Sequence, residues 1–422
     1  MKKVNIISLG CPKNLVDSET MAGQLSHNGF LPVEKQNTAD VIILNTCAFI
    51  KQARNETYRK IAEISKKKSK QQKFVVCGCL PQLEKDTLFT KYPKIDILLG
   101  SSDFVKLPNI LKNNCSATLE ISKPNFILST QPKIFSTPPS HAYIKIAEGC
   151  NNRCNYCIIP QLRGNFRSRK MEFIINDVKN IVATGRKEVI LIAQDTTMYG
   201  IDIYKKFVLP LLLKKIAKIN GLNWIRLLYT HPAHFTDVLI SELAENEKIC
   251  KYIDIPIQHT DDRILKAMGR PLSKTIFSTI EKLRKKIPKV ALRTTVMVGY
   301  PNETEKIFKQ MLTNLNTFQF DWLGGFVYSQ EKNTLSADNI PQKVKKERFN
   351  EMMVLQQKIT YQKNKNRIGK IFKILADTEK DGHTEFQAPE IDGKVIFSTK
   401  QTPGKILHSK ISSVKNVYDL IT

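Results

Sequence analysis

The segment YIKIAEGCNNRCNYCIIPQLRGNFRSR, residues 143–169, decides the fold of this chain. It opens with a strand-like run, residues 143–148, and three cysteines follow at once with C-x3-C-x2-C spacing: Cys150, Cys154 and Cys157. TIM-like (β/α) barrels place their chemistry at the C-terminal ends of their strands. We therefore predict that this segment opens a partial barrel and that its first loop carries a reactive centre.

The spacing of these cysteines favours an iron–sulfur cluster. Three thiolates on one loop can bind three irons of a 4Fe-4S cube, which leaves the fourth iron open for catalysis. A structural zinc site or a cysteine-rich turn is the alternative. Zinc normally takes four ligands, and no further Cys or His lies close by in sequence, although a distant one could complete the set. We therefore predict that Cys150, Cys154 and Cys157 are the catalytic metal ligands.

The surrounding segment, residues 141–365, alternates strand-like and helix-like runs. This pattern predicts βα units in a partial TIM-like barrel. The strand candidates are residues 143–148, 187–194, 223–229, 251–257, 290–299 and 320–329.

The two ends of the chain predict different architectures. In residues 1–118, continuous apolar runs alternate with helical stretches, which predicts a small doubly wound α/β domain with parallel strands. Residues 119–140 are rich in Ser and Pro and read as a linker. Residues 366–422 hold short strand-like runs broken by Gly and Pro, which fits a small all-β barrel. The N-terminal strand candidates are residues 3–9, 40–46, 73–78 and 95–100.

A second set of cysteines lies in the N-terminal segment. Cys11, Cys47 and Cys79 each follow the end of a predicted strand. Parallel strands end at the same sheet edge, so the three thiols should converge and could hold a second cluster. Three scattered core cysteines are the alternative. We interpret the others as packing residues or as incidental ones in helical or edge settings: Cys77, Cys115 and Cys250.

The composition of the chain indicates which partners and which cellular compartment to expect. The 422 residues carry a formal net charge of +27, which favours contact with a polyanion such as RNA, with a solvated lysine-rich surface as the alternative. No run of about 18 apolar residues could span a membrane. The apolar part of MKKVNIISLGCPKN is too short for a signal peptide. We therefore expect a cytoplasmic protein, in which nine cysteines favour metal binding over disulfides.

Several motifs together resemble the methylthiotransferase family of the radical S-adenosylmethionine (SAM) superfamily, over essentially the whole chain. They are SLGCPKNLVDSE (8–19), NTCAFIKQA (45–53), GCLPQ (78–82), the segment at 143–169 and LIAQDTTMYGID (191–202). The resemblance implies an N-terminal methylthiotransferase domain, a radical SAM barrel and a C-terminal TRAM β-barrel.

Other motifs resemble one branch of that family, which modifies the β-carbon of an aspartate in small-subunit ribosomal protein twelve. These are AQDTTMYG (193–200), YSQE (328–331) and APEIDG (388–393). The acidic APEIDG patch also suits a basic ribosomal protein. YTHPAH (229–234) departs from the branch, which usually has a tyrosine before the proline. The alternatives are the branch that modifies a tRNA adenosine, and a non-catalytic RNA-binding metalloprotein in which both cysteine sets are structural.

The resemblance also implies two 4Fe-4S clusters, one on each cysteine set, and SAM as cofactor. Tyr156 matches the superfamily motif. Polar residues at or near barrel strand ends are further candidates for SAM contacts, although such groups often only satisfy backbone: Gln194, Asp195, Gln258 and Arg293. Asp195 could bond a ribose hydroxyl, and Arg293 could pair with a carboxylate.

The implied partners are the ribosomal protein, free or embedded in ribosomal RNA, and an electron donor such as flavodoxin or ferredoxin. We expect a monomer that does not contact a membrane. The arginines after the cluster loop are expected to bind substrate, to favour the reduced cluster, or to form a solvated basic loop: Arg163, Arg167 and Arg169.

Overall fold

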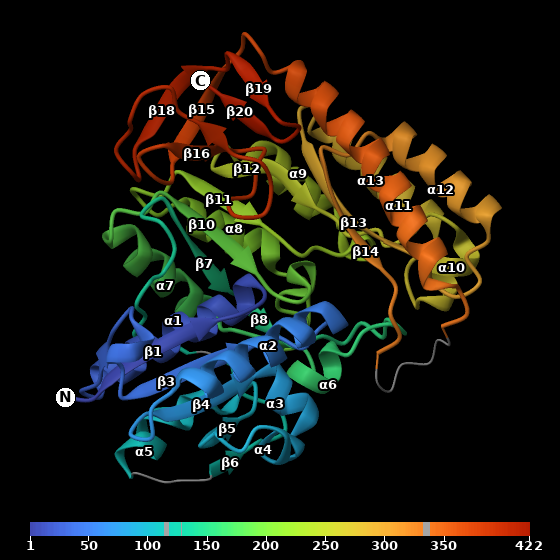
Figure 1. The fold of residues 1–422 in the computed structure, drawn as a ribbon. Coiled ribbons are helices and arrows are strands. Elements are labelled where there is room, and N and C mark those ends of the chain that lie inside the picture. Colours follow the sequence, from blue (N-terminus) through green and yellow to red (C-terminus); the bar gives the residue numbers. More distant parts are fainter. Residues whose placement is uncertain (114–117, 128, 332–337) are drawn as a thin grey trace.

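The computed structural model describes residues 1–113, 118–127, 129–331 and 338–422, and Cys115 lies outside them. Figure 1 shows three parts in chain order, with the N-terminal part at the bottom, a large parallel sheet with its helices in the middle, and the C-terminal sheet at the top. The predicted fold class is confirmed: a doubly wound α/β domain, a partial parallel barrel and a small β domain.

The N-terminal sheet has the order β2-β1-β3-β4-β5-β6 and is parallel throughout. Its strands are β1 (Lys3–Ser8), β2 (Leu31–Pro32), β3 (Val41–Thr46), β4 (Lys73–Gly78), β5 (Ile97–Leu99) and β6 (Thr118–Glu120). Every residue of β3 is buried, because helices cover both faces of the sheet. One face packs on α1 (Pro12–His27) and α5 (Leu107–Lys112), and the other on α2 (Lys51–Lys67), α3 (Cys79–Glu84) and α4 (Thr87–Lys91). The edge strands β2 and β6 were not predicted.

The central sheet has the order β14-β13-β12-β11-β10-β7, with all neighbours parallel. Its strands are β7 (His141–Lys145), β10 (Glu188–Ile192), β11 (Trp224–Leu227), β12 (Ile249–Asp254), β13 (Ala291–Val298) and β14 (Trp322–Val327). The helices on its outer face are α7 (Met171–Ala183), α8 (Leu209–Ala217), α9 (Asp237–Glu245), α11 (Ser273–Lys286) and α12 (Glu305–Phe318). Cys250 lies inside β12 and is buried, so the expected helical or edge setting was wrong for it.

The C-terminal sheet is mixed, because β17 and β20 pair in parallel while the other neighbours are antiparallel. Its order is β18 (Ile406–Lys410), β15 (Ile371–Ala376), β16 (Asp381–Thr384), β17 (Val395–Ile396), β20 (Asp419–Ile421) and β19 (Ser413–Lys415). The helix α13 (Gln342–Lys365) packs on β14 and leads into this sheet. None of the helices in the described ranges is apolar enough over a sufficient length to cross a membrane.

The APEIDG segment of the C-terminal domain faces the central sheet. The carboxylate of Asp392 accepts a hydrogen bond from Tyr252 at 2.7 Å and lies 3.4 Å from Nε of Arg293. Its side chain is only 3% exposed. The expectation of an acidic surface patch for a basic substrate was therefore wrong at Asp392, because a barrel arginine and a barrel tyrosine satisfy this carboxylate inside the protein.

A buried charge network joins the same two domains. His383 of β16 contacts Glu188 of β10 at 2.6 Å and Asp377 at 2.8 Å, and Arg226 contacts Glu188 at 2.7 Å. Burial opposes the charge on His383, yet the two carboxylates raise its pKa to about 9. Burial likewise opposes the charge on Glu188, but Arg226 and His383 hold its pKa at about 2. The interface therefore contains a protonated histidine at neutral pH.

This histidine predicts a loss of stability at alkaline pH. The folded-state pKa of about 9 exceeds the ordinary value of about 6.5, so the contribution is fully present below pH 6.5 and is lost as the pH rises through 9. We expect the free energy of unfolding to fall by roughly 3 kcal/mol across this window. His383→Gln should flatten the dependence in urea titrations, whereas His408→Gln, at an exposed position in the same domain, should not. An unchanged slope in His383→Gln would contradict the assignment.

Candidate active site at the junction of the first two domains

The first cysteine loop leaves the short strand β8 (Ala147–Glu148) through Gly149. Gly149 has φ +78°, and a Cβ atom there would lie 2.1 Å from the carbonyl oxygen of Asn165. The N–H of Cys150 donates to the carbonyl of Gly164 at 3.1 Å. A glycine is therefore required where the loop turns away from the strand, and the turn sets the direction of the cysteine that follows.

The other side of the loop rests on the turn after α10 (Asp262–Ala267). Asn155 donates through its N–H to Met268 at 3.0 Å and through its side chain to Ala267 at 2.7 Å. Nη1 of Arg270 lies 3.9 Å from Sγ of Cys154. Tyr156 packs in a small apolar cluster behind the loop, with Ile264, Met268, Tyr300, Ile307, Tyr328 and Met297. The loop is thus held on both sides.

The thiols of this loop are crowded. Burial raises the pKa of Cys150 to about 11 and that of Cys157 to about 12, and the neighbouring cysteines contribute to both shifts. Buried thiols that oppose one another's ionisation lose their protons when a thiolate-binding metal is present. This donor set fits an iron–sulfur cluster.

The second cysteine set is also brought together at the sheet edge. Cys11 precedes α1, Cys47 follows β3, and Cys79 begins α3. Gly10 has φ +90°, and a Cβ atom there would lie 2.9 Å from Sγ of Cys47. Burial, with contributions from Cys79 and Cys11, raises the pKa of Cys47 to about 12. The thiols therefore lie close enough to influence one another, whereas Cys77 is buried within β4, where its Sγ lies 3.9 Å from Sδ of Met21.

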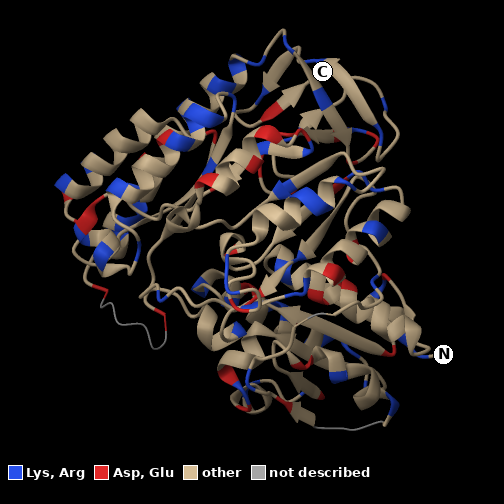
Figure 2. Cartoon of the chain, turned by 180° about the vertical axis from the view of Figure 1, so that it is seen from behind, with Lys and Arg blue, Asp and Glu red and all other residues tan. Residues whose placement is uncertain are grey.

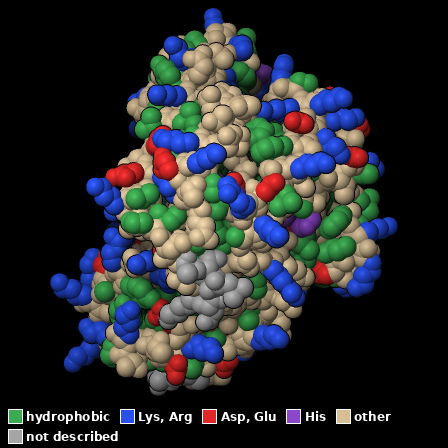
Figure 3. Space-filling model, turned by 90° about the vertical axis from the view of Figure 1, so that its right-hand side faces the viewer, with side chains coloured by type: hydrophobic (Ala, Val, Ile, Leu, Met, Phe, Trp, Pro, Cys, Tyr) green, Lys and Arg blue, Asp and Glu red, His purple; other side chains and the backbone are tan. Residues whose placement is uncertain are grey.

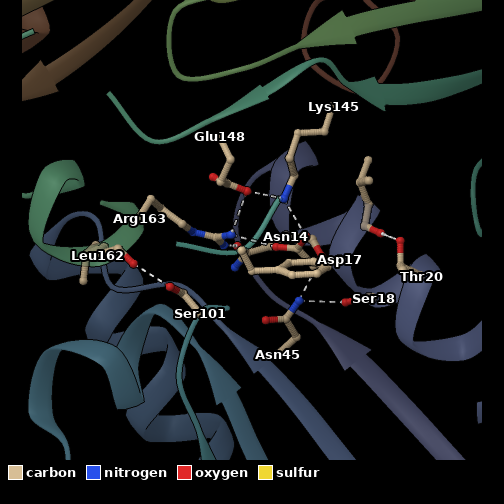
Figure 4. Close-up of polar contacts among 12 residues, drawn as sticks. Asn14, Asp17, Ser18, Thr20, Asn45, Ser101, Lys145, Glu148, Leu162 and Arg163 are labelled. Atoms are coloured by element: carbon tan, nitrogen blue, oxygen red, sulfur yellow. Dashed lines mark hydrogen bonds and ion pairs between the residues drawn. The ribbon is translucent and has the colours of Figure 1, made fainter. Parts of the chain in front are cut away.

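Arg163 joins the two domains beside both cysteine sets. It ends α6 (Ile159–Arg163), which follows Cys157 and packs on α3. Its guanidinium donates to Asp17 at 2.8 Å and to Asn14, and it lies 3.4 Å from Glu148. Figure 4 shows Arg163 of α6 meeting Asn14 and Asp17 of α1 and Glu148 of β8. Arg163 is 4% exposed, so the reading as a solvated basic loop was wrong for this residue.

Lys145 completes this junction. Its ammonium contacts Asp17 and Glu148, each at 2.5 Å, and Glu148 also accepts a hydrogen bond from Gln194 at 2.5 Å. The two cations and two carboxylates pair fully with one another (Figure 4). The network therefore ties the N-terminal domain to β7 and to the strand end that carries Gln194.

Gln194 and Asp195 follow β10 and contact residues in and just before the first cysteine loop. Asp195 accepts a hydrogen bond from Asn152 of that loop at 2.7 Å and contacts Nδ1 of His234 at 2.9 Å. Burial opposes its charge, but the bond with His234 helps to keep its pKa below the ordinary value. Oε1 of Gln194 is buried and has no hydrogen-bond partner among the described residues. The side-chain oxygen of Gln194 could therefore accept a hydrogen bond from a ligand bound next to the cysteine loop.

Gln258 and Arg293 occupy different surroundings. Gln258 follows β12 with φ +68° and bridges to Val296 of β13 through its backbone. Arg293 lies near the start of β13, where its guanidinium contacts Asp254 at 3.0 Å and Asp392 at 3.4 Å. Two carboxylates of the protein already neutralise Arg293, so a cofactor carboxylate would have to displace one of them.

Sequence reasoning missed several groups at this site. His231 and His234 stack with ring centroids 4.6 Å apart and, with Asp195, bring ligand atoms within 4.8 Å of one another. Burial lowers the pKa of His231 to about 3, so its ring is neutral. Lys13, two residues after Cys11, is buried against Tyr229. The two histidines stand in YTHPAH, which departs from the branch pattern, and Lys13 stands in the motif SLGCPKN, so both motifs carried a signal for these groups.

Comparison with known families agrees with this architecture. Residues 3–100 match the uncharacterized protein family UPF0004, residues 144–315 the radical SAM superfamily, and residues 368–422 the TRAM domain. Among solved structures, the radical SAM methyltransferase TsrM from Kitasatospora setae aligns with a TM-score of 0.58 at 12% identity, over 77% of this chain and 73% of that one. This likeness concerns the fold. The superfamily match implies a 4Fe-4S cluster and SAM.

Relatives of known name align with the chain from end to end. Ribosomal protein uS12 methylthiotransferase RimO of Caldicellulosiruptor saccharolyticus is 42% identical over 100% of this chain and 99% of its own length. The RimO of Thermoanaerobacter sp. is 42% identical over 100% and 99%, and that of Clostridium botulinum 44% over 99% and 97%. The resemblance to the ribosomal-protein branch is confirmed, and the chain belongs to the RimO family of radical SAM methylthiotransferases.

Proposed function

We propose that this protein inserts a methylthio group at the β-carbon of an aspartate in ribosomal protein uS12. The observation that carries the proposal is the end-to-end similarity, at 40–44% identity, to relatives named for this activity. The junction described above supports it, because both cysteine sets belong to one interface that Arg163 spans.

The two cysteine sets are proposed to hold two 4Fe-4S clusters. Cys150, Cys154 and Cys157 would hold the cluster that works with SAM, and Cys11, Cys47 and Cys79 would hold an auxiliary one. When bound, SAM and the first cluster would supply hydrogen abstraction from an unactivated carbon, which acid–base side chains cannot do at neutral pH, and the auxiliary cluster would carry the sulfur to be transferred.

The chain's own side chains are proposed to bind and orient SAM. Gln194 is held through Nε2 by Glu148, which leaves Oε1 to accept a hydrogen bond from the cofactor. Oδ1 of Asp195 accepts from Thr197, and Oδ2 faces Asn152 and His234, where a ribose hydroxyl would compete for it. The proposed SAM contacts are Tyr156, Gln194, Asp195, Gln258 and Arg293. The role of Arg293 requires displacement of Asp254 or Asp392.

The partners follow from the reaction. A one-electron donor of the flavodoxin or ferredoxin type would serve the first cluster, and the enzyme would act as a monomer in the cytoplasm, where its ribosomal substrate lies. Lys and Arg are spread over all three domains in Figure 2, and on the face in Figure 3 they do not gather in one stripe. This spread favours general attraction to the ribosome over a dedicated RNA groove on that face.

Mass spectrometry of ribosomal protein and tRNA from a deletion strain tests the function. We expect uS12 to lose its methylthio mass increment and to regain it when the wild-type gene is restored, while tRNA modification stays unchanged. If uS12 keeps the increment and a tRNA adenosine loses its own, the protein belongs functionally with the tRNA-modifying enzymes. The chemistry would then stand, but the proposed substrate would be wrong.

A further inference from the structure

Lys13 is a buried cation without a carboxylate partner among the described residues. It is 8% exposed, and its Nζ lies 3.3 Å from the centroid of the Tyr229 ring. The other buried lysines of the described chain are paired: Lys145 contacts Asp17 and Glu148, and Lys345 contacts Asp338. Lys13 thus differs from every comparable lysine in the described part of the protein.

Burial of an unpaired ammonium is costly. The effective penalty in proteins exceeds what a cation regains over an aromatic ring, even when both groups are desolvated. The contact with Tyr229 therefore does not offset the burial of Lys13. The nearest carboxylates of the junction, Asp17 and Glu148, are already shared between Lys145 and Arg163. Inside the chain, the thiol of Cys11 also interacts with Lys13, but the proposed cluster would take that thiolate as a ligand. A carboxylate partner for Lys13 would therefore have to come from outside the described residues.

Lys13 lies beside groups that adjoin both cysteine sets. It follows Cys11 by two residues, and its ring partner Tyr229 lies just past the C-terminal end of β11. The carbonyl of Tyr229 accepts the N–H of Thr196, and the adjacent Asp195 contacts Asn152 of the first cysteine loop. The ammonium therefore stands at the domain junction, between the residues that carry the two cysteine sets.

We propose that Lys13 forms a carboxylate-binding subsite, in which its ammonium pairs with the side-chain carboxylate of the substrate aspartate while the Tyr229 ring holds it from the other side. The proposal rests on the function proposed above and deepens it. A pairing at the carboxylate would fix the adjacent β-carbon, and would distinguish aspartate from asparagine, whose amide carries no charge.

Peptide affinity tests this subsite without turnover. The probes are two peptides of the modified uS12 loop, with Asp or with Asn at the target position, titrated by fluorescence anisotropy against cluster-reconstituted enzyme. We expect wild type to bind the Asp peptide roughly 10- to 100-fold more tightly, as for a charge-assisted hydrogen bond of about 1.5–3 kcal/mol. Lys13→Met should remove this preference and leave the affinity for the Asn peptide within about twofold.

Lys91→Met is the matched control. Lys91 also lies over a tyrosine ring, that of Tyr58 at 3.9 Å, but on the exposed surface of the N-terminal domain. This variant should keep the full preference for Asp. Iron content and circular dichroism of Lys13→Met, equal to those of wild type, show that the variant is folded and loaded.

Equal binding of the two peptides by wild type would overturn the proposal, and so would a preserved preference in Lys13→Met. A preserved preference with loss of iron would assign Lys13 to the cluster at Cys11 instead. The proposed function is tested by a separate result, the modification of uS12 in cells. If the wild-type enzyme binds the Asp peptide preferentially but no uS12 is modified in cells, the subsite stands and the proposed reaction fails.

Discussion

Replacing Cys154 by alanine is expected to abolish SAM cleavage, so that 5′-deoxyadenosine formation under reductant falls to the background of the assay. Cys154 is the central thiol of the loop between β8 and α6, and Arg270 approaches its sulfur. Loss of an outer partner of a metal ligand already costs about 10- to 100-fold in affinity or activity, and loss of the ligand itself should exceed this. Iron content after anaerobic reconstitution should fall by about four per chain.

Cys77→Ala is the control for this variant. Cys77 is fully buried, whereas Cys154 is only partly buried, and Cys77 lies within β4, where it faces Met21. The control should keep its iron and its cleavage activity, although removing a buried thiol will cost some stability. Undiminished cleavage in Cys154→Ala, or an equal loss of cleavage in Cys77→Ala, would refute the assignment of the radical centre to this loop.

Replacing Cys47 by alanine is expected to separate the two halves of the reaction. Cys47 belongs to the second cysteine set, next to Cys11 and Cys79, and packs on Gly10. The first loop is held by its own contacts with Asn165, Gly164 and Met268, none of which involves Cys47. SAM cleavage should therefore stay measurable, while methylthio transfer to uS12 falls to background.

SAM cleavage and methylthio transfer are measured in the same reaction mixture. 5′-Deoxyadenosine is measured by liquid chromatography and the modified uS12 peptide by mass spectrometry, and wild type gives both products. A parallel loss of both products in Cys47→Ala, with the fold intact by circular dichroism, would show that the two cysteine sets do not divide the work as proposed.

The strands that the sequence predicted best are those that are buried on both faces along their whole length. β3 and β4 are covered on both faces, so they appear as continuous apolar runs, and their ends were placed to within a residue or two. β2 and β6 hold two and three residues, and such short edge strands leave no pattern to detect. The convergence of Cys11, Cys47 and Cys79 was predictable because parallel strands end at one edge.

Charged residues were harder to place. A solvated loop was one of three readings for Arg163, and Asp392 was expected in an acidic patch that suits a basic substrate. In the structure, Arg163 joins two domains and Asp392 is buried against Arg293 and Tyr252. The sequence reports the sign of a charge but not the element that packs against it. Three of their partners lie more than 90 positions away along the chain: Asp17 for Arg163, and Arg293 and Tyr252 for Asp392.

By itself the sequence determined the two cysteine sets, the three-part fold and the family, because ligand spacing and strand periodicity are local properties. Only the tertiary structure decided which charges are neutralised. It paired Lys145 and Arg163 with Asp17 and Glu148, and left Lys13 against the ring of Tyr229. The reason is physical: the cost of burying a charge depends on partners that folding brings from distant segments.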